Sequence, residues 1–303
     1  MQNDAPLPGV IRRTTFDVEQ AGREPELATT DEFSVRFWGV RGSIACPGSA
    51  YTRYGGNTSC LEIRCGQYVL VFDGGTGLRP LGEHLRNTPA VDLDLFFSHS
   101  HFDHISGFPF FSPLFVPSNR LSMWAGHLLP DRTLREVLCT MMAVPLFPVP
   151  LEIFTAETNY HDFRAGDTLS PKPGVTVRTA PLNHPNNATG YRVEFSGKSI
   201  CYVTDTEHLP GQLDRNILGL IQDADIFIYD STYTDEEFPR FVGWGHSTWQ
   251  QGVRLADAAG VKTCVIFHHD PSHADDVMDG IAAEAERVRP GTIVAREGMI
   301  LRP

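Results

Sequence analysis

The feature that most constrains this chain is the stretch 93–104, which reads LDLFFSHSHFDH. Its first half is an apolar run of strand length, and its second half holds a cluster of metal-ligand side chains: His99, His101, Asp103 and His104. Polar side chains at the end of a buried strand are costly unless something binds them. Because side chains alternate along a strand, the first two histidines point toward one ion, while the last two residues begin a turn and can reach a second. The stretch therefore predicts a metal site, and two ions suit it better than one.

Composition describes an ordinary globular protein. The chain has 303 residues, of which 41% are hydrophobic and 20% charged, so it is long enough to bury a sizeable core. It contains no apolar run of about 18 residues, and its N-terminus lacks a basic head followed by an apolar segment. The six cysteines are scattered, which is typical of reduced thiols. We therefore predict a cytoplasmic location and no membrane partner.

The balance of charge weighs against a polyanionic partner. Formal net charge is −12, and the sequence has no lysine- or arginine-rich run. A protein that binds a long polyanion usually carries a basic face. We therefore expect no long nucleic acid as a partner, although bound metals would make a pocket locally positive.

The chain divides into a short leader and one large ordered region. Residues 1–31 mix proline, glycine, threonine and acids without periodicity, and we interpret them as a flexible leader. Short apolar strands interspersed with helical segments fill 32–303 and indicate a mixed α and β domain. Between about 108 and 169 the sequence becomes aromatic and proline-rich, which argues against a continuous helix or a central strand. We interpret this stretch as an insertion, either a lid or a homodimer contact, with an extended core connection as an equal alternative.

Polar residues recur at the ends of other apolar strands. They follow or end the runs VTVRTAPLN, SICYVTD, IFIYD and CVIF, and one precedes a predicted helix in GWGHST. Strand ends in mixed sheets converge on one rim, so residues far apart in sequence can meet there. The residues at these positions are His184, Asp205, Asp230 and His246, with His268 and His269 as competing choices after CVIF.

Several motifs resemble those of the metallo-β-lactamase fold superfamily. Besides the His-x-His-x-Asp-His spacing, they are FWGVRGS, GGNTSC, FDGGTG, YVTDT, IYDSTY and GHST. The resemblance is closest to the phosphodiesterase branch, which includes ribonuclease Z, phosphoribosyl cyclic phosphodiesterase and bacterial cyclic-nucleotide phosphodiesterases. It covers nearly all of 33–303 and implies an α+β fold, a four-layer αββα sandwich that forms a hydrolase domain over 32–303.

The resemblance also implies a dinuclear metal centre. Imidazole and carboxylate ligands without thiolate suit Zn²⁺ and also admit Mn²⁺ or Fe. Two such ions acidify a bridging hydroxide, which can attack a phosphodiester. In FDGGTG, Asp73 is expected behind the ligands, where it orients them. One ion is assigned His99, His101 and His184, the other Asp103, His104 and His268, with Asp205 between them.

The resemblance places an active-site histidine in GHST. We expect His246 to protonate the leaving oxygen or to hold a non-bridging one. Asp230 keeps that imidazole oriented, with a purely structural role as the alternative. Asp103 joins these two in the predicted catalytic set because it holds one of the ions.

Substrate contacts are expected from two segments. Arg41 and Asn57 lie in a glycine-rich loop, and Ser247 lies before a predicted helix whose N–H groups suit a phosphoryl oxygen. The pairs Ser247/Gln250 and Thr248/Gln251 are alternative capping boxes for that helix. The remaining histidines are expected at the surface: His84, His127, His161 and His273. His208 is expected in an exposed loop, with a substrate contact as the alternative.

These expectations combine into a dinuclear metal-dependent phosphodiesterase that acts on a small phosphodiester, a cyclic nucleotide or a related cyclic phosphate. The main alternative is a tRNA 3′ endonuclease of the ribonuclease Z type, which the acidic balance and the lack of a basic, glycine-rich arm disfavour. A lactonase or lactamase would use the same metals. A metal-binding scaffold without catalysis is the alternative that is not an enzyme.

Overall fold

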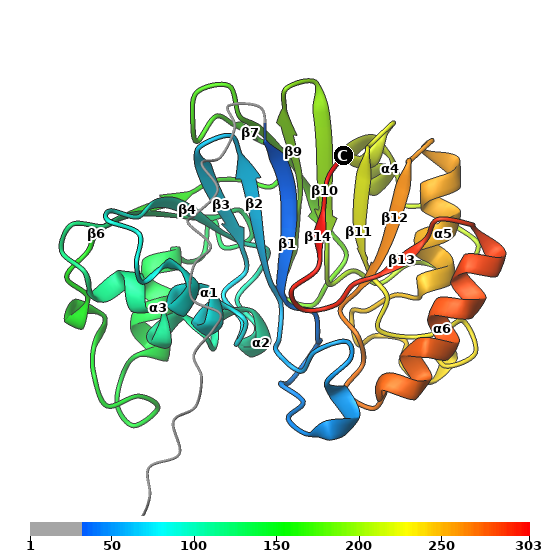
Figure 1. Ribbon diagram of the computed structural model, residues 1–303, viewed down its shortest axis with the longest axis horizontal. Helices are drawn as coiled ribbons and strands as arrows, with labels where there is room; N and C mark the ends of the chain where they lie inside the picture. The colour runs from blue at the N-terminus through cyan, green and yellow to red at the C-terminus, as the bar shows by residue number, and fades with distance from the viewer. Residues whose placement is uncertain (1–31) are drawn as a thin grey trace, which may run out of the picture.

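The computed structural model describes residues 32–303, so the predicted leader 1–31 lies outside the described residues. Two seven-stranded sheets stack face to face, with helices on their outer sides (Figure 1). The first sheet has the order β14-β1-β2-β3-β4-β5-β6 and the second has the order β13-β12-β11-β10-β9-β8-β7. Together with the covering helices, the two sheets form the predicted α+β sandwich, and this prediction is confirmed.

The strands of the first sheet are β1 Phe33–Gly39, β2 Cys60–Cys65, β3 Tyr68–Phe72, β4 Asp92–Phe97, β5 Arg120–Ala125, β6 Glu157–Asp162 and β14 Ile300–Leu301. Those of the second sheet are β7 Thr168–Leu169, β8 Thr176–Leu182, β9 Ala188–Phe195, β10 Lys198–Val203, β11 Ile226–Asp230, β12 Thr263–Phe267 and β13 Ile293–Val294. The α-helices are α1 Leu78–Leu85, α2 Phe102–Ile105, α3 Leu134–Met141, α4 Arg215–Ile221, α5 Trp249–Ala258 and α6 Asp275–Val288. Short 3-10 helices are η1 Ser49–Tyr51, η2 Phe108–Phe110, η3 Ser112–Phe115, η4 Leu151–Ile153 and η5 Phe238–Arg240.

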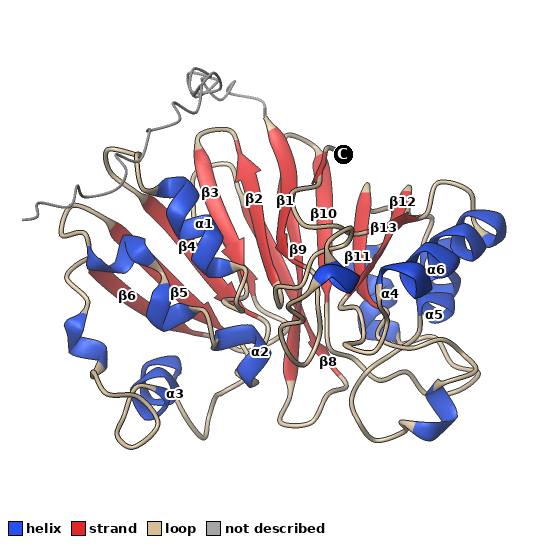
Figure 2. Cartoon of the chain, turned by 60° about the horizontal axis from the view of Figure 1, so that its bottom comes forward, coloured by secondary structure: helices blue, strands red, loops and turns tan. Residues whose placement is uncertain are grey.

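The main core lies between the two sheets and combines aliphatic side chains with a group of packed aromatic rings. Phe72 and Phe96 stack with their centroids 5.0 Å apart, and Tyr191 packs edge-on against both. Figure 2 shows α1 against the outer face of the first sheet, where its leucines pack on β3 and β4. Helices α4 and α5 cover the second sheet in the same way. Burial of apolar surface in these layers fixes the sheets relative to each other.

The aromatic, proline-rich segment 108–169 contributes two strands to the first sheet and joins them through loops, 3-10 helices and α3. It supplies β5 and β6, which extend the first sheet in parallel from β4. Its prolines fall in the connections, so the expectation that they forbid a central strand is wrong, and the alternative of a core connection describes much of the segment better. The loop after α3 does expose apolar side chains, with Val144 and Leu146 79% and 74% exposed.

The topology brings many strand ends to one edge. Strands β3, β4 and β5 run parallel, as do β10, β11 and β12 in the other sheet. Polar residues that follow these strands therefore meet between the sheets. Within 32–303, the structure contains no helix of the length and hydropathy that a membrane span requires.

Candidate metal centre

Several polar side chains of the centre follow strand ends and have a left-handed backbone conformation. Asp73, Asp205 and His268 each follow a buried strand and each has a left-handed φ, of 62°, 54° and 62° respectively. Such a conformation is uncommon for residues other than glycine and costs of order 1–3 kcal/mol where the residue is strained. Three such residues around one centre indicate that the fold holds these side chains in place for a function.

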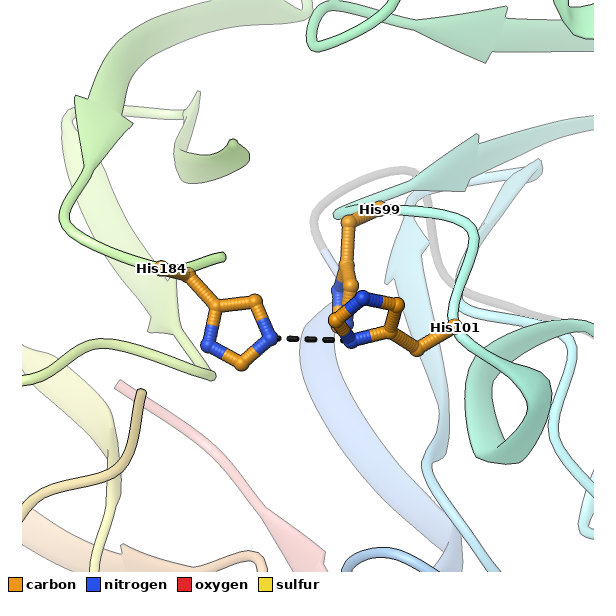
Figure 3. Close-up of side chains that lie close together, drawn as sticks. All are labelled: His99, His101 and His184. Atoms are coloured by element: carbon orange, nitrogen blue, oxygen red, sulfur yellow. Dashed lines mark hydrogen bonds between the residues drawn. The ribbon is translucent and has the colours of Figure 1, made fainter. Parts of the chain in front are cut away.

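The first ligand group consists of three histidines from both sheets. Potential ligand nitrogens of His99, His101 and His184 lie within 4.8 Å of one another (Figure 3). The Nε2 atom of His184 is 3.0 Å from Nδ1 of His101. Nε2 of His99 is buried and has no hydrogen-bond partner among the described residues. A buried nitrogen without a partner is costly, so the group fits a bound divalent cation.

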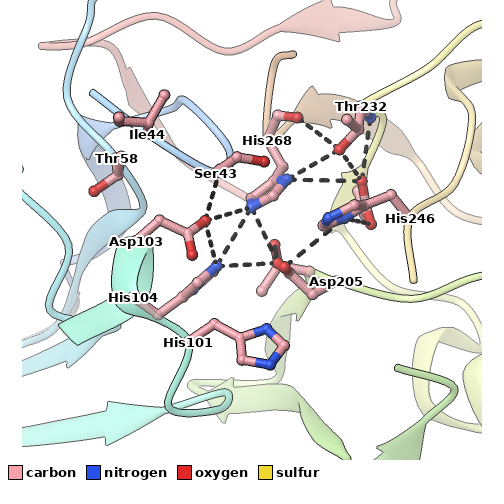
Figure 4. Close-up of polar contacts among 12 residues, drawn as sticks. Ser43, Ile44, Thr58, His101, Asp103, His104, Asp205, Thr232, His246 and His268 are labelled. Atoms are coloured by element: carbon pink, nitrogen blue, oxygen red, sulfur yellow. Dashed lines mark hydrogen bonds and ion pairs between the residues drawn. The ribbon is translucent and has the colours of Figure 1, made fainter. Parts of the chain in front are cut away.

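The second ligand group lies beside the first. Its members Asp103, His104, Asp205 and His268 also place ligand atoms within 4.8 Å of one another (Figure 4). Nε2 of His104 and Nε2 of His268 are 3.3 Å apart, and Oδ2 of Asp103 is 3.2 and 3.3 Å from them. Imidazoles and carboxylates gathered in this way form an oxygen and nitrogen donor set suited to Zn²⁺, Mn²⁺ or Fe.

Asp205 lies between the two groups and turns one oxygen toward each. Its Oδ1 is 3.2 Å from Nε2 of His104 and 3.2 Å from Nε2 of His268. Its Oδ2 is 3.6 Å from Nε2 of His99 and 3.8 Å from Nε2 of His184. This division of the two oxygens is the geometry expected of a carboxylate that bridges two cations.

Hydrogen bonds on the far side of the rings fix which nitrogen faces the centre. Nδ1–H of His184 donates to the Gly245 carbonyl at 2.7 Å, and Nδ1–H of His104 donates to Asp73 at 2.8 Å. His268 contacts the Thr232 hydroxyl through Nδ1 at 3.0 Å. Each ring therefore presents Nε2 inward with its lone pair free.

Asp73 anchors this arrangement, as the sequence predicted. Its Oδ2 accepts from His104, from the Ser98 hydroxyl at 2.8 Å and from the Tyr202 hydroxyl at 2.7 Å. Its Oδ1 accepts from the Ser98 backbone N–H at 2.7 Å. Every donor around this buried carboxylate is used to hold the loop that carries the ligands.

Replacing Asp73 with asparagine is expected to lower metal affinity about 10- to 100-fold, because an amide cannot accept from all four donors. Competition with a chelator, followed by elemental analysis, measures the change. Tyr202→Phe removes a single donor and leaves the carboxylate, so it should lower affinity far less. Equal losses in the two variants would show that Asp73 does not orient the ligand loop.

His246 and Asp230 form a pair at the edge of the ligand groups. Nδ1 of His246 is 3.1 Å from Oδ2 of Asp230 and 3.8 Å from Oδ2 of Asp205. Burial by itself lowers the pKa of an imidazole, but Asp230, with help from Asp205, outweighs it and raises the pKa of His246 to about 9. Asp230 is further fixed by the Thr232 backbone N–H and hydroxyl. The Asp230 carboxylate therefore favours the protonated form of this imidazole.

The three predicted substrate contacts have internal partners instead. Arg41 is fully buried and donates to the Gly55 and His273 carbonyls at 2.8 and 2.7 Å. The Asn57 amide donates to Glu297 at 3.0 Å, and the fully buried Ser247 contacts His208 and Tyr229. Polar groups inside a fold need hydrogen-bond partners, and these three side chains find theirs within the protein. They therefore stabilise the loops around the centre.

The choice between the adjacent histidines is also visible. The His269 ring turns away and its Nε2 faces the Ala295 carbonyl at 2.9 Å, while burial lowers its pKa to about 3. The neighbouring Gly42 leaves room for the His268 ring, which an added Cβ would approach to 2.4 Å. The structure thus brings His268 rather than His269 into the ligand group.

Of the two alternative capping pairs expected for α5, Thr248/Gln251 forms: the Thr248 hydroxyl accepts from the Gln251 N–H at 3.1 Å. Three histidines expected at the surface are buried within loops near the centre. They are His127, His208 and His273. Ser98, Thr232 and Tyr202 also support the ligands and were not predicted, because an isolated hydroxyl gives no sequence pattern.

Comparison with known proteins identifies the family. Residues 69–269 match the family described as a beta-lactamase superfamily domain. This match covers more than half of the chain, and the chain therefore belongs to the beta-lactamase superfamily. The predicted resemblance to metallo-β-lactamase fold proteins and the predicted class of enzyme, a metal-dependent hydrolase, are confirmed.

Curated relatives are ribonucleases. The chain is 24% identical over 289 residues to the Ribonuclease Z of Myxococcus xanthus, which covers 80% of this chain and 91% of that protein. It is 36% identical over 102 residues to the Ribonuclease Z of Gemmatimonas aurantiaca, where the match spans only 34% of this chain and 31% of the relative. The crystal structure of human tRNase Z, short form, shares the fold with a TM-score of 0.61 and 18% identity, over 88% of this chain and 98% of that one.

These relatives overturn the expected absence of a nucleic-acid partner. The net charge of −12 led to the prediction of a small substrate without long nucleic acid, yet the relatives carry the name of an enzyme that cleaves RNA. The physical reason is that net charge averages over the whole surface, whereas cations bound in the ligand groups would supply positive charge locally.

Proposed function

We propose that this protein is a dinuclear metal-dependent phosphodiesterase that cleaves RNA as ribonuclease Z does. The observation that carries the proposal is Asp205, whose two oxygens face two separate ligand groups 3.2 to 3.8 Å away. Two-metal sites with nitrogen and oxygen donors serve in-line displacement at phosphorus. The ribonuclease names of the relatives support RNA as the substrate.

In this proposal the two groups would hold divalent ions, with Zn²⁺ as the best match to their imidazole and carboxylate donors. Bound there, such ions supply Lewis acidity and a water of lowered pKa. The chain itself fixes the ligands through Asp73, Thr232 and the Gly245 carbonyl. It also buries most of the ligand side chains, which strengthens their electrostatic contacts with a phosphate.

His246 then has a role that metals do not supply. Its Nδ1–H points to Asp230, which leaves Nε2–H as the proton donor available to a substrate. We assign this proton to the leaving oxygen of the RNA phosphodiester. Asp230 holds the ring in position and stabilises its positive charge.

The sequence favoured a cyclic nucleotide and ranked the ribonuclease second. The relatives reverse this order, and the cyclic nucleotide becomes the comparison substrate. The basic, glycine-rich arm that the sequence lacks bears on a different step. Such an arm would contribute to tRNA binding, whereas cleavage of the phosphodiester depends on the metal centre.

The test is a product assay on metal-loaded protein. We expect cleavage of a precursor tRNA transcript at its 3′ trailer, with turnover of 3′,5′-cyclic AMP and 2′,3′-cyclic AMP at least about tenfold slower at matched concentrations. The transcript carrying a phosphorothioate at the cleavage site serves as the control for position. An intact transcript together with rapid hydrolysis of a cyclic nucleotide would reject the proposed RNA substrate and return the assignment to the cyclic phosphodiesters.

A further inference from the structure

An aromatic series leads from His246 to the surface. The Tyr233 ring lies edge-on to His246 at 6.2 Å, and Phe241 stacks on Tyr233 at 4.4 Å with an interplanar angle of 6°. Trp244 follows edge-on to Phe241 at 5.6 Å and is 63% exposed. The series therefore ends in a large indole in solvent, two residues from the proposed catalytic histidine.

The loop that carries Trp244 is held firmly. One carboxylate oxygen of Glu207 accepts from the backbone N–H groups of Gly243 and Gly245, on either side of the tryptophan, at 2.7 and 2.9 Å. Both glycines have a left-handed φ, of 91° and 85°, which favours glycine at these positions. The exposed indole is thus presented from a fixed backbone, and its exposure is not the result of a loose loop.

A second exposed ring lies within the stretch that carries four of the ligand residues. Phe102 comes directly between His101 and Asp103 and is 72% exposed. Ile44 is 64% exposed and follows Ser43, whose N–H donates to Asp103 at 2.7 Å (Figure 4). Both side chains come from the first-sheet half of the fold, whereas Trp244 comes from the second. Large exposed apolar side chains next to site residues from both halves of the fold indicate a ligand surface.

We propose that Trp244 and Phe102 form a nucleobase-binding surface that stacks on an unpaired base next to the scissile phosphate. This inference rests on the proposed function, since it names how the same site holds its substrate. Base stacking on aromatic rings contributes to binding without basic side chains and tolerates any base. It therefore suits a chain with a net charge of −12.

A nucleobase can reach this surface in an RNA strand or in a free nucleotide, and the experiment separates the two. Equilibrium binding of AMP and of ribose 5-phosphate to the metal-loaded protein isolates the contribution of the base, because both ligands carry the same phosphate. AMP should bind about tenfold more tightly or better. Turnover of the precursor tRNA transcript and of 2′,3′-cyclic AMP then shows which source of bases the surface serves.

The variants make the result specific. Trp244→Ala and Phe102→Ala should each remove most of the preference for AMP over ribose 5-phosphate, and Trp244→Phe should retain it. Phe115→Ala is the matched control, because Phe115 is 44% exposed and packs on Phe154 in another part of the fold. In the transcript, abasic nucleotides beside the cleavage site should slow the parent protein but not Trp244→Ala.

Two failures are distinguishable. An AMP preference that is absent in the parent, or unchanged in both alanine variants, would overturn the nucleobase surface even if RNA is cleaved. A preference that depends on Trp244, in a protein that leaves RNA and cyclic nucleotides intact, would support the surface and reject the proposed function.

Discussion

Asp205→Asn is expected to release at least one metal ion and to lower kcat for phosphodiester hydrolysis by about a thousandfold, or about 4 kcal/mol of transition-state stabilisation. The carboxylate is 99% buried and turns one oxygen toward each ligand group. An amide keeps the size of the side chain but loses the charge and one acceptor. Elemental analysis of protein purified without chelator measures the ions, and initial rates measure kcat.

The matched control is Asp94→Asn. Asp94 is equally buried, at 1% exposed, but it lies within β4 and bonds to the Trp124 indole at 2.8 Å. This variant keeps an acceptor for the indole but loses the charge that faces Lys172 at 3.3 Å, so it should lose some stability while its metal content stays unchanged. Full metal occupancy in Asp205→Asn would contradict the bridging role of that carboxylate.

Most of the ligand set could be predicted from the sequence because it follows strands. An apolar run that stops at a histidine or an aspartate marks where a buried strand reaches an edge, and the β4 end gives four candidates in six residues. Asp205 and Asp230 each stand alone at the end of a strand. Such isolated residues could be predicted only from their joint pattern and the family motifs. Their convergence follows from the parallel pairing of β10, β11 and β12.

The residues that sequence analysis misplaced share a different property. Arg41, Asn57 and Ser247 are polar and close to motifs, and such residues contact either a substrate or the protein itself. Their partners are carbonyls and side chains from distant segments, such as His273 for Arg41 and Glu297 for Asn57, and no local pattern reveals these contacts. The segment 108–169 was interpreted wrongly for a related reason. Its many prolines argued against strands, yet between them lie β5, which pairs with β4, and β6, which pairs with β5.

His246→Ala is expected to lower kcat on RNA about 10²- to 10⁴-fold while the metal content stays at the parent level, because the ring assists catalysis and is not among the proposed ligands. His161→Ala, in β6 at the far edge of the first sheet, should leave both quantities unchanged.

The two roles considered for the His246 ring predict different dependence on the leaving group. A proton donor matters little when the leaving oxygen is a stable phenolate, so bis-p-nitrophenyl phosphate should lose far less activity than RNA. A donor that only holds a non-bridging oxygen would affect both substrates alike, and Asp230→Asn should follow whichever pattern the histidine variant shows because the carboxylate acts through that ring.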